Sequence, residues 1–257
     1  MVVRPRAFFK MGCNDQNFFH LNGKVVVGTG AASSLGRKHV EAILQFSGVP
    51  KLLDIQDKKV RDLAFQLRTK YGAKVVSYGV DLTNDQEVEK SANSVFAEFG
   101  RVDGLLTTQQ TIQKLRIKII KNSQGSKTFL WKYGMVIWRW GLRVPSSVQH
   151  TLALRYPRTK NGVSLLNILS DLGIITPNQS LYENEGLSAN SQAVKPLTCP
   201  VVKSGFIRLT FYLLTHWPHL GVRCNAICPG GINNGQLKKL FRRRFLTNTT
   251  WSTCRYQ

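Results

Sequence analysis

The chain has 257 residues, with 36 lysine and arginine residues against 14 aspartate and glutamate residues, a formal net charge of +22. This length is typical of one α/β domain with a sizeable core, and no apolar run is long enough to span a membrane. The five cysteines are odd in number and lack paired spacing, which disfavours a disulfide scaffold and favours a reducing, cytoplasmic compartment.

The first predicted unit is a strand, a glycine-rich turn and a helix. We expect residues 1–20 to form a poorly ordered extension before it. The apolar run at 24–28 predicts a buried strand, the turn follows at 28–37, and helical spacing predicts a helix over 35–46. Pyrophosphate binds the free N–H groups at a helix N-terminus, and glycine lets the backbone approach it closely. The unit therefore predicts a dinucleotide cradle.

A second apolar run at 51–55 contains Asp54, eighteen residues after Gly36. An acid at this distance can accept hydrogen bonds from the adenosine ribose hydroxyls. The extra phosphate of NADP would be repelled by this carboxylate. Asp54 therefore favours NAD as the cofactor, with NADP the less favoured alternative.

The remaining elements continue the alternation of strands and helices, with no internal repeat. We expect strands near 74–80, 102–106, 163–168 and 222–228, and helices near 57–71, 84–99 and 200–216. This alternation predicts a doubly wound parallel sheet, a single Rossmann-type α/β domain over 21–236. The helix at 84–99 carries apolar residues at helical spacing that we expect in the core: Val88, Ala92, Val95, Phe96 and Phe99.

The ordered motifs resemble those of the short-chain dehydrogenase/reductase family. Thr29, Gly30 and Gly36 match its Thr-Gly-x-x-x-Gly-x-Gly signature, with a serine at the middle glycine. Residues 81–83, 100–105, 166–170 and 221–231 are similar to its later strand ends and to its Pro-Gly turn. The resemblance implies cofactor contacts from Thr29, Gly30, Ser33, Ser34, Leu35, Gly36, Asp54, Asp81, Leu82, Lys203, Pro229, Gly230 and Ile232.

The resemblance also implies hydride transfer between a nicotinamide and a small carbonyl or alcohol substrate. In the family a serine orients the substrate, a tyrosine supplies the proton, and a lysine activates the tyrosine and binds the nicotinamide ribose. Ser170 and Lys203 match two of these positions, but Cys199 stands at the tyrosine position. A thiol has a suitable pKa of about 8.5, yet its sulfur lies much closer to the backbone than a phenolic oxygen. We therefore expect impaired activity, and Tyr182 lacks the helical spacing to Lys203 that would replace the tyrosine.

Two other features concern the site. The long segment 174–195 lies between the serine and tyrosine positions, and we expect it to cap the substrate pocket, as inserts do in family members that act on sugar-like or polyol substrates. We expect Cys224 and Cys228 to be small buried residues of the sixth strand. Their order relative to His216 and His219 does not match a zinc motif, so we expect no metal site.

The basic residues concentrate where the family resemblance vanishes. Residues 107–160 hold eleven lysine and arginine residues and residues 237–257 hold six, and neither window contains an acidic residue. The rest of the chain has nineteen basic and fourteen acidic residues, an ordinary balance for an enzyme. We expect both windows to be irregular, which would remove the helix through which the family usually forms homo-oligomers.

We interpret both windows as out-of-frame translation, as in a frameshifted or decayed gene. Read one nucleotide earlier, suitable codons for 107–112 give Asn-Asn-Ala-Ala-Asn-Asn, which resembles the family turn Asn-Asn-Ala-Gly. In the same frame 141–149 gives Leu-Thr-Gly-Ala-Phe-Leu-Cys-Ser, typical of the interface helix. Residues 249–252, read one nucleotide later, can give Pro-Leu-Gly-Arg. The alternative is an unusual basic insertion.

Three hypotheses for function follow. The chain is an impaired NAD-dependent oxidoreductase, or a pseudoenzyme that still binds dinucleotide, or a basic nucleic-acid-binding protein. The last would use 107–160, with Trp131, Trp138 and Trp140 as stacking platforms. We see no recurring face of aromatic and basic residues there, so a nucleic-acid partner is the least favoured of the three.

Overall fold

The computed structural model describes residues 20–108, 151, 162–182, 186, 188, 192 and 197–232. Most of both basic windows, at 109–150, 152–161 and 233–257, lies outside these residues, as do residues 1–19 of the N-terminal extension. The interpretation of the windows as out-of-frame translation therefore stays a prediction. Within the described part of the chain, no helix combines the length and apolar character needed to cross a membrane.

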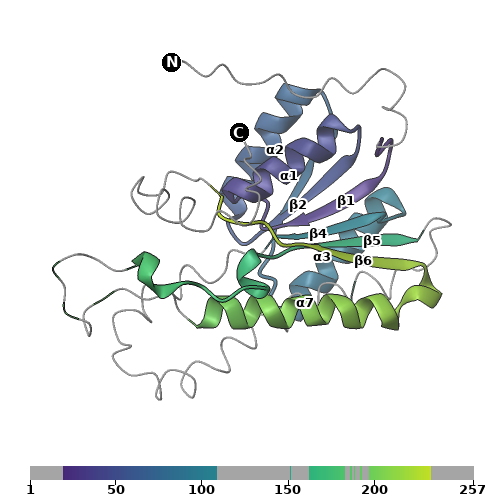
Figure 1. Ribbon diagram of the computed structural model, residues 1–257. Helices are drawn as coiled ribbons and strands as arrows, with labels where there is room; N and C mark the ends of the chain where they lie inside the picture. Colours follow the sequence, from purple (N-terminus) through teal and green to yellow (C-terminus); the bar gives the residue numbers. More distant parts are fainter. Residues whose placement is uncertain are drawn as a thin grey trace, which may run out of the picture.

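Six strands of the described residues form one sheet in the order β3-β2-β1-β4-β5-β6 (Figure 1), and every neighbouring pair is parallel. The strands are β1 (Val25–Thr29), β2 (Val49–Asp54), β3 (Val76–Gly79), β4 (Gly104–Thr108), β5 (Val163–Ile168) and β6 (Val222–Ile227). The strand order reverses between β1 and β4, and ligands of open α/β sheets bind at such a point, beyond the carboxyl ends of the strands. The predicted doubly wound parallel sheet is confirmed.

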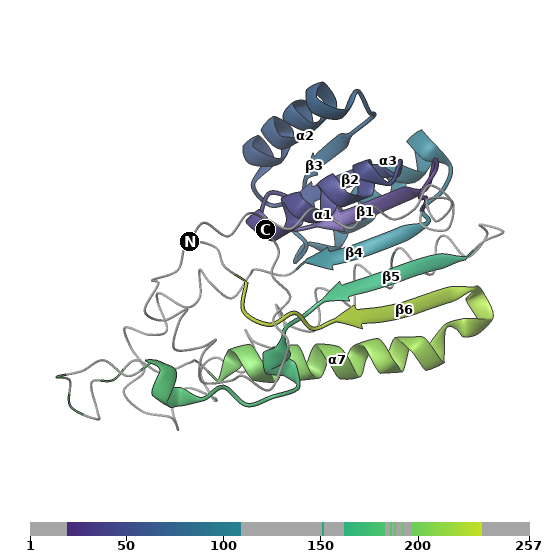
Figure 2. The ribbon, with the colours of Figure 1, turned by 45° about the horizontal axis from the view of Figure 1, so that its top comes forward.

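Helices cover both faces of the sheet (Figure 1). The helices are α1 (Ser34–Gln45), α2 (Asp57–Tyr71), α3 (Asp85–Phe99) and α7 (Thr198–His216), and the short 3-10 helices are η3 (Asp171–Gly173), η4 (Gln179–Tyr182) and η6 (Pro218–Leu220). Figure 2 shows α7 running along β5 and β6, on the face opposite α1 and α2. Each of the four longer helices starts within two residues of its predicted position.

The helix ends follow from local sequence. Asn84 caps α3, and its side-chain oxygen accepts hydrogen bonds from the backbone N–H groups of the first turn. Gly72 and Gly100 end α2 and α3 in the left-handed conformation, with φ of 61° and 65°. Glycine adopts this conformation without strain, so both helices stop where the sequence places a glycine.

Two apolar clusters hold the layers together. The cluster between the sheet and helices α3 and α7 includes Val27, Val95, Leu165 and Trp217, while α1 and α2 pack on the other face around residues such as Leu52. The prediction for α3 is correct for its buried residues but wrong for Phe96, which is 44% exposed. Phe96 lies beyond the edge of the buried stripe of α3, which consists of Val88, Ser91, Ala92 and Val95.

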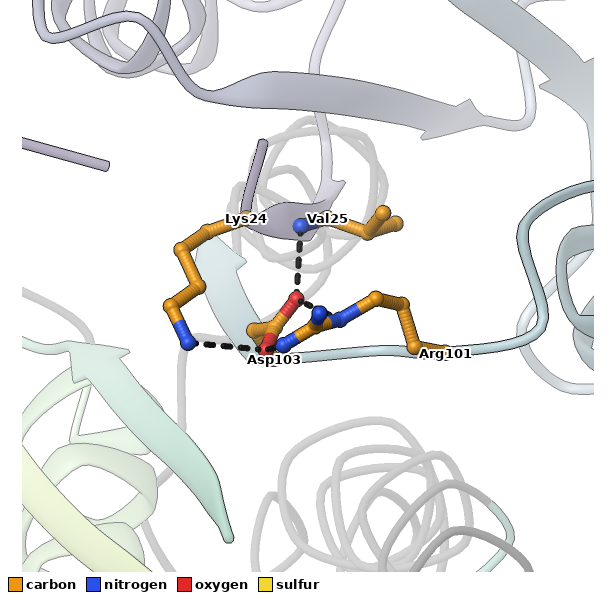
Figure 3. Close-up of polar contacts among 4 residues, drawn as sticks. All are labelled: Lys24, Val25, Arg101 and Asp103. Carbon is orange, nitrogen blue, oxygen red and sulfur yellow. Dashed lines mark hydrogen bonds and ion pairs between the residues drawn. The ribbon is translucent and has the colours of Figure 1, made fainter. Parts of the chain in front are cut away.

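The amino-terminal edge of the sheet is held by Asp103 (Figure 3). Its carboxylate accepts a hydrogen bond from the Val25 backbone N–H at 2.9 Å and one from the Arg101 Nε at 2.8 Å, and it pairs with Lys24 at 3.4 Å. Burial raises the pKa of Asp103, but the hydrogen bonds from Arg101 and Val25 outweigh it and leave the pKa below its usual range. These contacts join β1 to the start of β4.

Candidate active site

The turn from β1 into α1 requires glycine at two positions. Gly30 has φ of +62°, and a Cβ there would lie 2.4 Å from the carbonyl oxygen of Thr108. A Cβ on Gly36 would lie 2.1 Å from the carbonyl oxygen of Gly30. No side chain fits at either distance, so the first turn of α1 packs directly on the turn that precedes it.

The serine residues of the turn have separate roles. Ser33 is the N-cap of α1, and its hydroxyl accepts a hydrogen bond from the Gly36 backbone N–H at 3.0 Å. Ser34, in place of the middle glycine of the family signature, is the first residue of α1 and is exposed. An exposed side chain does not obstruct the contact between helix and turn, which explains why serine fits there. Leu35 follows as a half-buried residue, and Thr29 before the turn is buried.

Asp54 ends β2 and faces the same turn. One carboxylate oxygen accepts a hydrogen bond from the Ala32 backbone N–H and the other from the Gln56 backbone N–H, both at 2.9 Å. The side chain is therefore fixed in orientation, and each ionised oxygen keeps capacity to accept a further donor. The predicted ribose-binding acid thus contacts the predicted phosphate-binding turn.

Asp81 and Leu82 follow β3. One oxygen of the Asp81 carboxylate accepts hydrogen bonds from the Thr83 backbone N–H at 2.9 Å and hydroxyl at 2.7 Å. Leu82 packs against the cluster that faces α3. These contacts fix the loop at the carboxyl end of β3, beside the end of β2, as the predicted adenine contact requires.

The predicted substrate-orienting serine lies just beyond β5. The Ser170 hydroxyl donates to the Asp171 carboxylate at 2.8 Å and accepts from the Leu172 backbone N–H at 3.3 Å. The Asp171 backbone N–H donates to the Pro229 carbonyl oxygen at 3.0 Å. The serine segment is therefore tied to the predicted Pro-Gly turn after β6.

Lys203 lies on α7, one helical turn after Cys199. Burial lowers the pKa of Lys203, and the nearby thiols of Cys199 and Cys228 oppose that shift. The helix is held against the serine segment, because the Ser204 hydroxyl donates to the Gly173 carbonyl oxygen at 2.8 Å. The structure thus brings Ser170, Cys199 and Lys203 to one end of the sheet.

Cys228 lies beside the predicted site, which the sequence did not indicate. The sequence predicts it as a buried residue of the sixth strand, but it follows β6 by one residue and is only half-buried. Burial raises its pKa, while a hydrogen bond with the Ser170 backbone and the charge of Lys203 lower it. Its position before Pro229 and Gly230 was the available signal. Cys224 is buried as predicted, and burial raises its pKa to about 11.

The turn after β6 borders the pocket. Pro229 and Ile232 line a cavity of about 530 Å³ together with Leu35. A Cβ on Gly230 would lie 3.7 Å from the Asp171 carboxylate. The three predicted cofactor residues Leu35, Pro229 and Ile232 share one surface. The cavity extends along the sheet to Lys24 and Asp103 at the amino-terminal edge, and Asp54, Ser170 and Lys203 are not part of its lining. Tyr182 is buried at the end of η4, and no cluster of three or more metal-ligating side chains occurs among the described residues.

Known proteins resemble this arrangement. The family model described as short chain dehydrogenase matches residues 24–118. The "Short-chain dehydrogenase/reductase aba4" of Botryotinia fuckeliana (strain B05.10) is 26% identical over 216 residues, which are 84% of this chain and 74% of that protein.

Two solved structures share the fold. One is an NAD+-bound xylitol dehydrogenase, with a TM-score of 0.66 and 21% identity, covering 90% of this chain and 78% of that one. The other is the L-sorbose reductase of Gluconobacter frateurii complexed with NADPH and L-sorbose, with a TM-score of 0.63, 19% identity and the same two coverages of 90% and 78%.

Proposed function

The chain belongs to the short-chain dehydrogenase/reductase family, and from that premise we propose that it catalyses hydride transfer between NAD and a small carbonyl or hydroxyl compound, with impaired efficiency. One observation carries the proposal. The turn that only glycine can form at positions 30 and 36 is hydrogen-bonded to Asp54, at the carboxyl edge of the sheet where Ser170 and Lys203 also lie. The predicted dinucleotide cradle and the two groups predicted to act on a carbonyl therefore belong to the same edge, which supports the proposal.

The residues present fit a dinucleotide. The close packing that Gly30 and Gly36 allow brings the first turn of α1 onto the turn after β1, and a helix N-terminus of this kind suits a pyrophosphate. The half-buried Leu35 borders the cavity. Asp54 is rigidly held and accepts hydrogen bonds, which suits the ribose hydroxyls of NAD, whereas the additional phosphate of NADP would meet a carboxylate. Both cofactors occur among structures of this fold, so the preference for NAD rests on Asp54.

When bound, the nicotinamide supplies or accepts the hydride. Ser170 would donate a hydrogen bond to the substrate oxygen by turning its hydroxyl away from the Asp171 carboxylate, to which it donates in this structure, while the Leu172 N–H continues to hold the hydroxyl oxygen. Lys203 would bind the nicotinamide ribose, and its charge favours the developing alkoxide. The Asp171 backbone N–H donates to the Pro229 carbonyl oxygen, which connects the segment of Ser170 to the turn after β6.

The proton donor is the weak point of the site. Cys199 stands one turn before Lys203, where the family has its tyrosine, and its thiol is several bonds shorter than a phenol. Proton transfer requires the donor to lie within hydrogen-bond distance of the substrate oxygen, so the acidity of the thiol does not compensate for the shorter side chain of Cys199. We therefore expect slow turnover in the chain as written.

The same replacement favours a second candidate, a pseudoenzyme that binds dinucleotide and acts as a partner protein. Cofactor binding depends on the turn, Asp54 and Lys203, none of which needs Cys199. The nucleic-acid hypothesis depends on Trp131, Trp138 and Trp140, which lie outside the described residues.

The substrate class follows from the segment between the two catalytic positions. The expected cap at 174–195 lies in part outside the described residues, at 183–185, 187, 189–191 and 193–195. From the place of this segment in the sequence we infer that the substrate is a sugar-like or polyol compound. The xylitol dehydrogenase and L-sorbose reductase fit this class by name. We also propose a cytoplasmic location, from the cysteine count, and a family-type homo-oligomer if the basic window at 107–160 is restored to frame.

The test is a titration of the full chain with NADH, followed by cofactor fluorescence, with and without a panel of ketoses, which are the substrates that NADH can reduce. Fluorescence enhancement with measurable oxidation supports the oxidoreductase, and enhancement without oxidation supports the pseudoenzyme. No enhancement at millimolar NADH would exclude both. In a parallel arm, Cys199→Tyr with 107–160 restored to frame yields activity only if the chain descends from an active enzyme.

A further inference from the structure

Lys51 occupies a position in the sheet where the neighbouring strands place valine. It lies within β2, paired in register with Val27 of β1 and with Val76 of β3. It is 0% exposed and is one of the largest fully buried side chains among the described residues. The proposed reaction does not use it.

The amine of Lys51 has an unusual environment. Its Nζ lies 3.1 Å from the centroid of the Phe99 ring, at the C-terminal end of α3. It has no hydrogen-bond partner within the described part of the chain. A cation attracts an aromatic face, but a single ring does not replace the hydration of a buried ammonium.

The charged groups that face Lys51 come from each element packed around it. Glu98 lies on α3, Lys74 precedes β3, and Arg68 lies at the end of α2. The titratable hydroxyl of Tyr78 on β3 completes the cluster. Within the described residues, the cluster therefore contains one acid, Glu98, and three bases, which are Lys51, Lys74 and Arg68. A protonated Lys51 has no counter-ion of its own.

The acid of this cluster is already engaged. Glu98 pairs with Lys74 at 2.8 Å and accepts a hydrogen bond from the Tyr78 hydroxyl at 3.3 Å. The Lys74 Nζ also lies 4.3 Å from the centroid of the Phe99 ring that contacts Lys51. When Lys51 carries a charge, two cations share one ring and compete for one carboxylate.

We propose that Lys51 is a proton-controlled switch for the corner formed by β2, β3 and α3. With the amine neutral, Lys51 packs against Phe99 and Glu98 keeps its contacts with Lys74 and Tyr78. With the amine protonated, Lys51 draws the Glu98 carboxylate toward the interior and the corner loosens. The switch is independent of the proposed hydride transfer.

The direction of the pH dependence is fixed by burial. Burial lowers the pKa of Lys51 to about 8, against the attraction of Glu98, which raises it. Between this value and the ordinary lysine pKa of about 10.4, the unfolded chain binds a proton that the folded chain does not. The stability contributed by the neutral amine is therefore gained as pH rises through this interval and is absent below it.

The first test is denaturant unfolding of the full chain between pH 7 and 10.5, comparing the natural protein with Lys51→Met and with Lys74→Met. Methionine keeps the unbranched shape of the buried side chain without its charge. Relative to Lys51→Met, the natural protein should gain about tenfold in its folding equilibrium constant per pH unit above 8. Lys74→Met removes the cation that competes with Lys51 for Glu98, so the folded pKa of Lys51 should rise and the gain in stability should begin at a higher pH than in the natural protein. Parallel curves for the natural protein and Lys51→Met would overturn the proposal.

A second measurement does not depend on any variant folding. Carbon-13 NMR of labelled lysine side chains in the natural protein should show the resonance assigned to Lys51 titrating near pH 8. Lys203 must be assigned separately, because burial lowers its pKa as well. In Glu98→Gln the Lys51 midpoint should move further down, because the attraction that supports the charged form is lost. A Lys51 resonance that titrates at the ordinary lysine pKa of about 10.4 contradicts the switch.

Discussion

The Asp54 carboxylate accepts the backbone N–H of Ala32 at 2.9 Å, so the acid that ends β2 is bonded to the turn that follows β1. The two parts of the proposed cofactor site are thereby fixed relative to each other before any ligand binds. Such preorganisation lowers the entropic cost of binding. A change at Asp54 should therefore affect both the ribose contact and the conformation of the turn.

The substitution Asp54→Asn tests the cofactor preference. The asparagine side chain retains one carbonyl oxygen for the Ala32 N–H but removes the negative charge, so discrimination against the NADP phosphate should fall. We expect NADH to bind about tenfold more weakly and NADPH to bind more tightly than in the natural protein. Fluorescence titration with both cofactors measures the ratio. An unchanged ratio of the NADH and NADPH affinities would show that Asp54 does not distinguish the ribose hydroxyl from the ribose phosphate.

Substitution of Gly36 by alanine tests the cradle. The new Cβ would lie 2.1 Å from the Gly30 carbonyl oxygen, which is backbone and cannot move aside alone. We expect a loss of about 3 kcal/mol of stability and no detectable NADH binding. Ser34→Gly is the matched control, because Ser34 is exposed and its replacement should leave binding intact. Normal binding by Gly36→Ala would rule out the packing described for this turn.

Replacement of Cys199 by tyrosine tests the missing proton donor. A phenol at this position, one turn from Lys203, should reach the substrate oxygen that the thiol does not. General acid catalysis contributes about a hundredfold or more to such reactions, so turnover should rise by at least that factor. The control is Cys228→Ser, which changes the other thiol near Lys203 and should give no comparable rise. The assay is NADH oxidation with polyol-derived ketones.

The Asp103 contacts predict an acid-dependent loss of stability. Because its folded pKa lies below the unfolded value, the unfolded chain binds more protons as pH falls below about 4, and the stabilisation disappears as pH passes through the folded pKa. At neutral pH, Asp103→Asn should cost about 2 kcal/mol, since Arg101 and Lys24 lose their charged acceptor. Its stability should also depend less on pH between about 2 and 5, as equilibrium unfolding would reveal. Identical acid profiles for both proteins would refute this role.

Much of the fold followed from alternating strand and helix patterns. The strand predicted at 163–168 and the helix at 57–71 coincide with β5 and α2, because glycine and apolar spacing mark their ends. The strand expected at 102–106 is β4, which lies two residues later and includes Thr107 and Thr108. Polar residues at a strand end resemble a loop in sequence, but both threonines are buried and paired with β5.

Side-chain environments were less predictable than elements. Lys51 sits in an apolar run, and nothing in its spacing signals that the amine itself is buried. Cys228 looks like a strand residue until the end of β6 places it beside Ser170. Both depend on contacts between segments far apart in the chain, which periodicity alone does not encode.

The bond from the Asp171 N–H to the Pro229 carbonyl has a consequence for motion. The residue after Ser170 and the loop that borders the pocket are joined by this peptide-to-peptide hydrogen bond. A ligand that displaces the loop would strain or break the bond, whose net contribution is about 1 kcal/mol. Displacement of the loop would therefore favour a small displacement of the serine in the same direction.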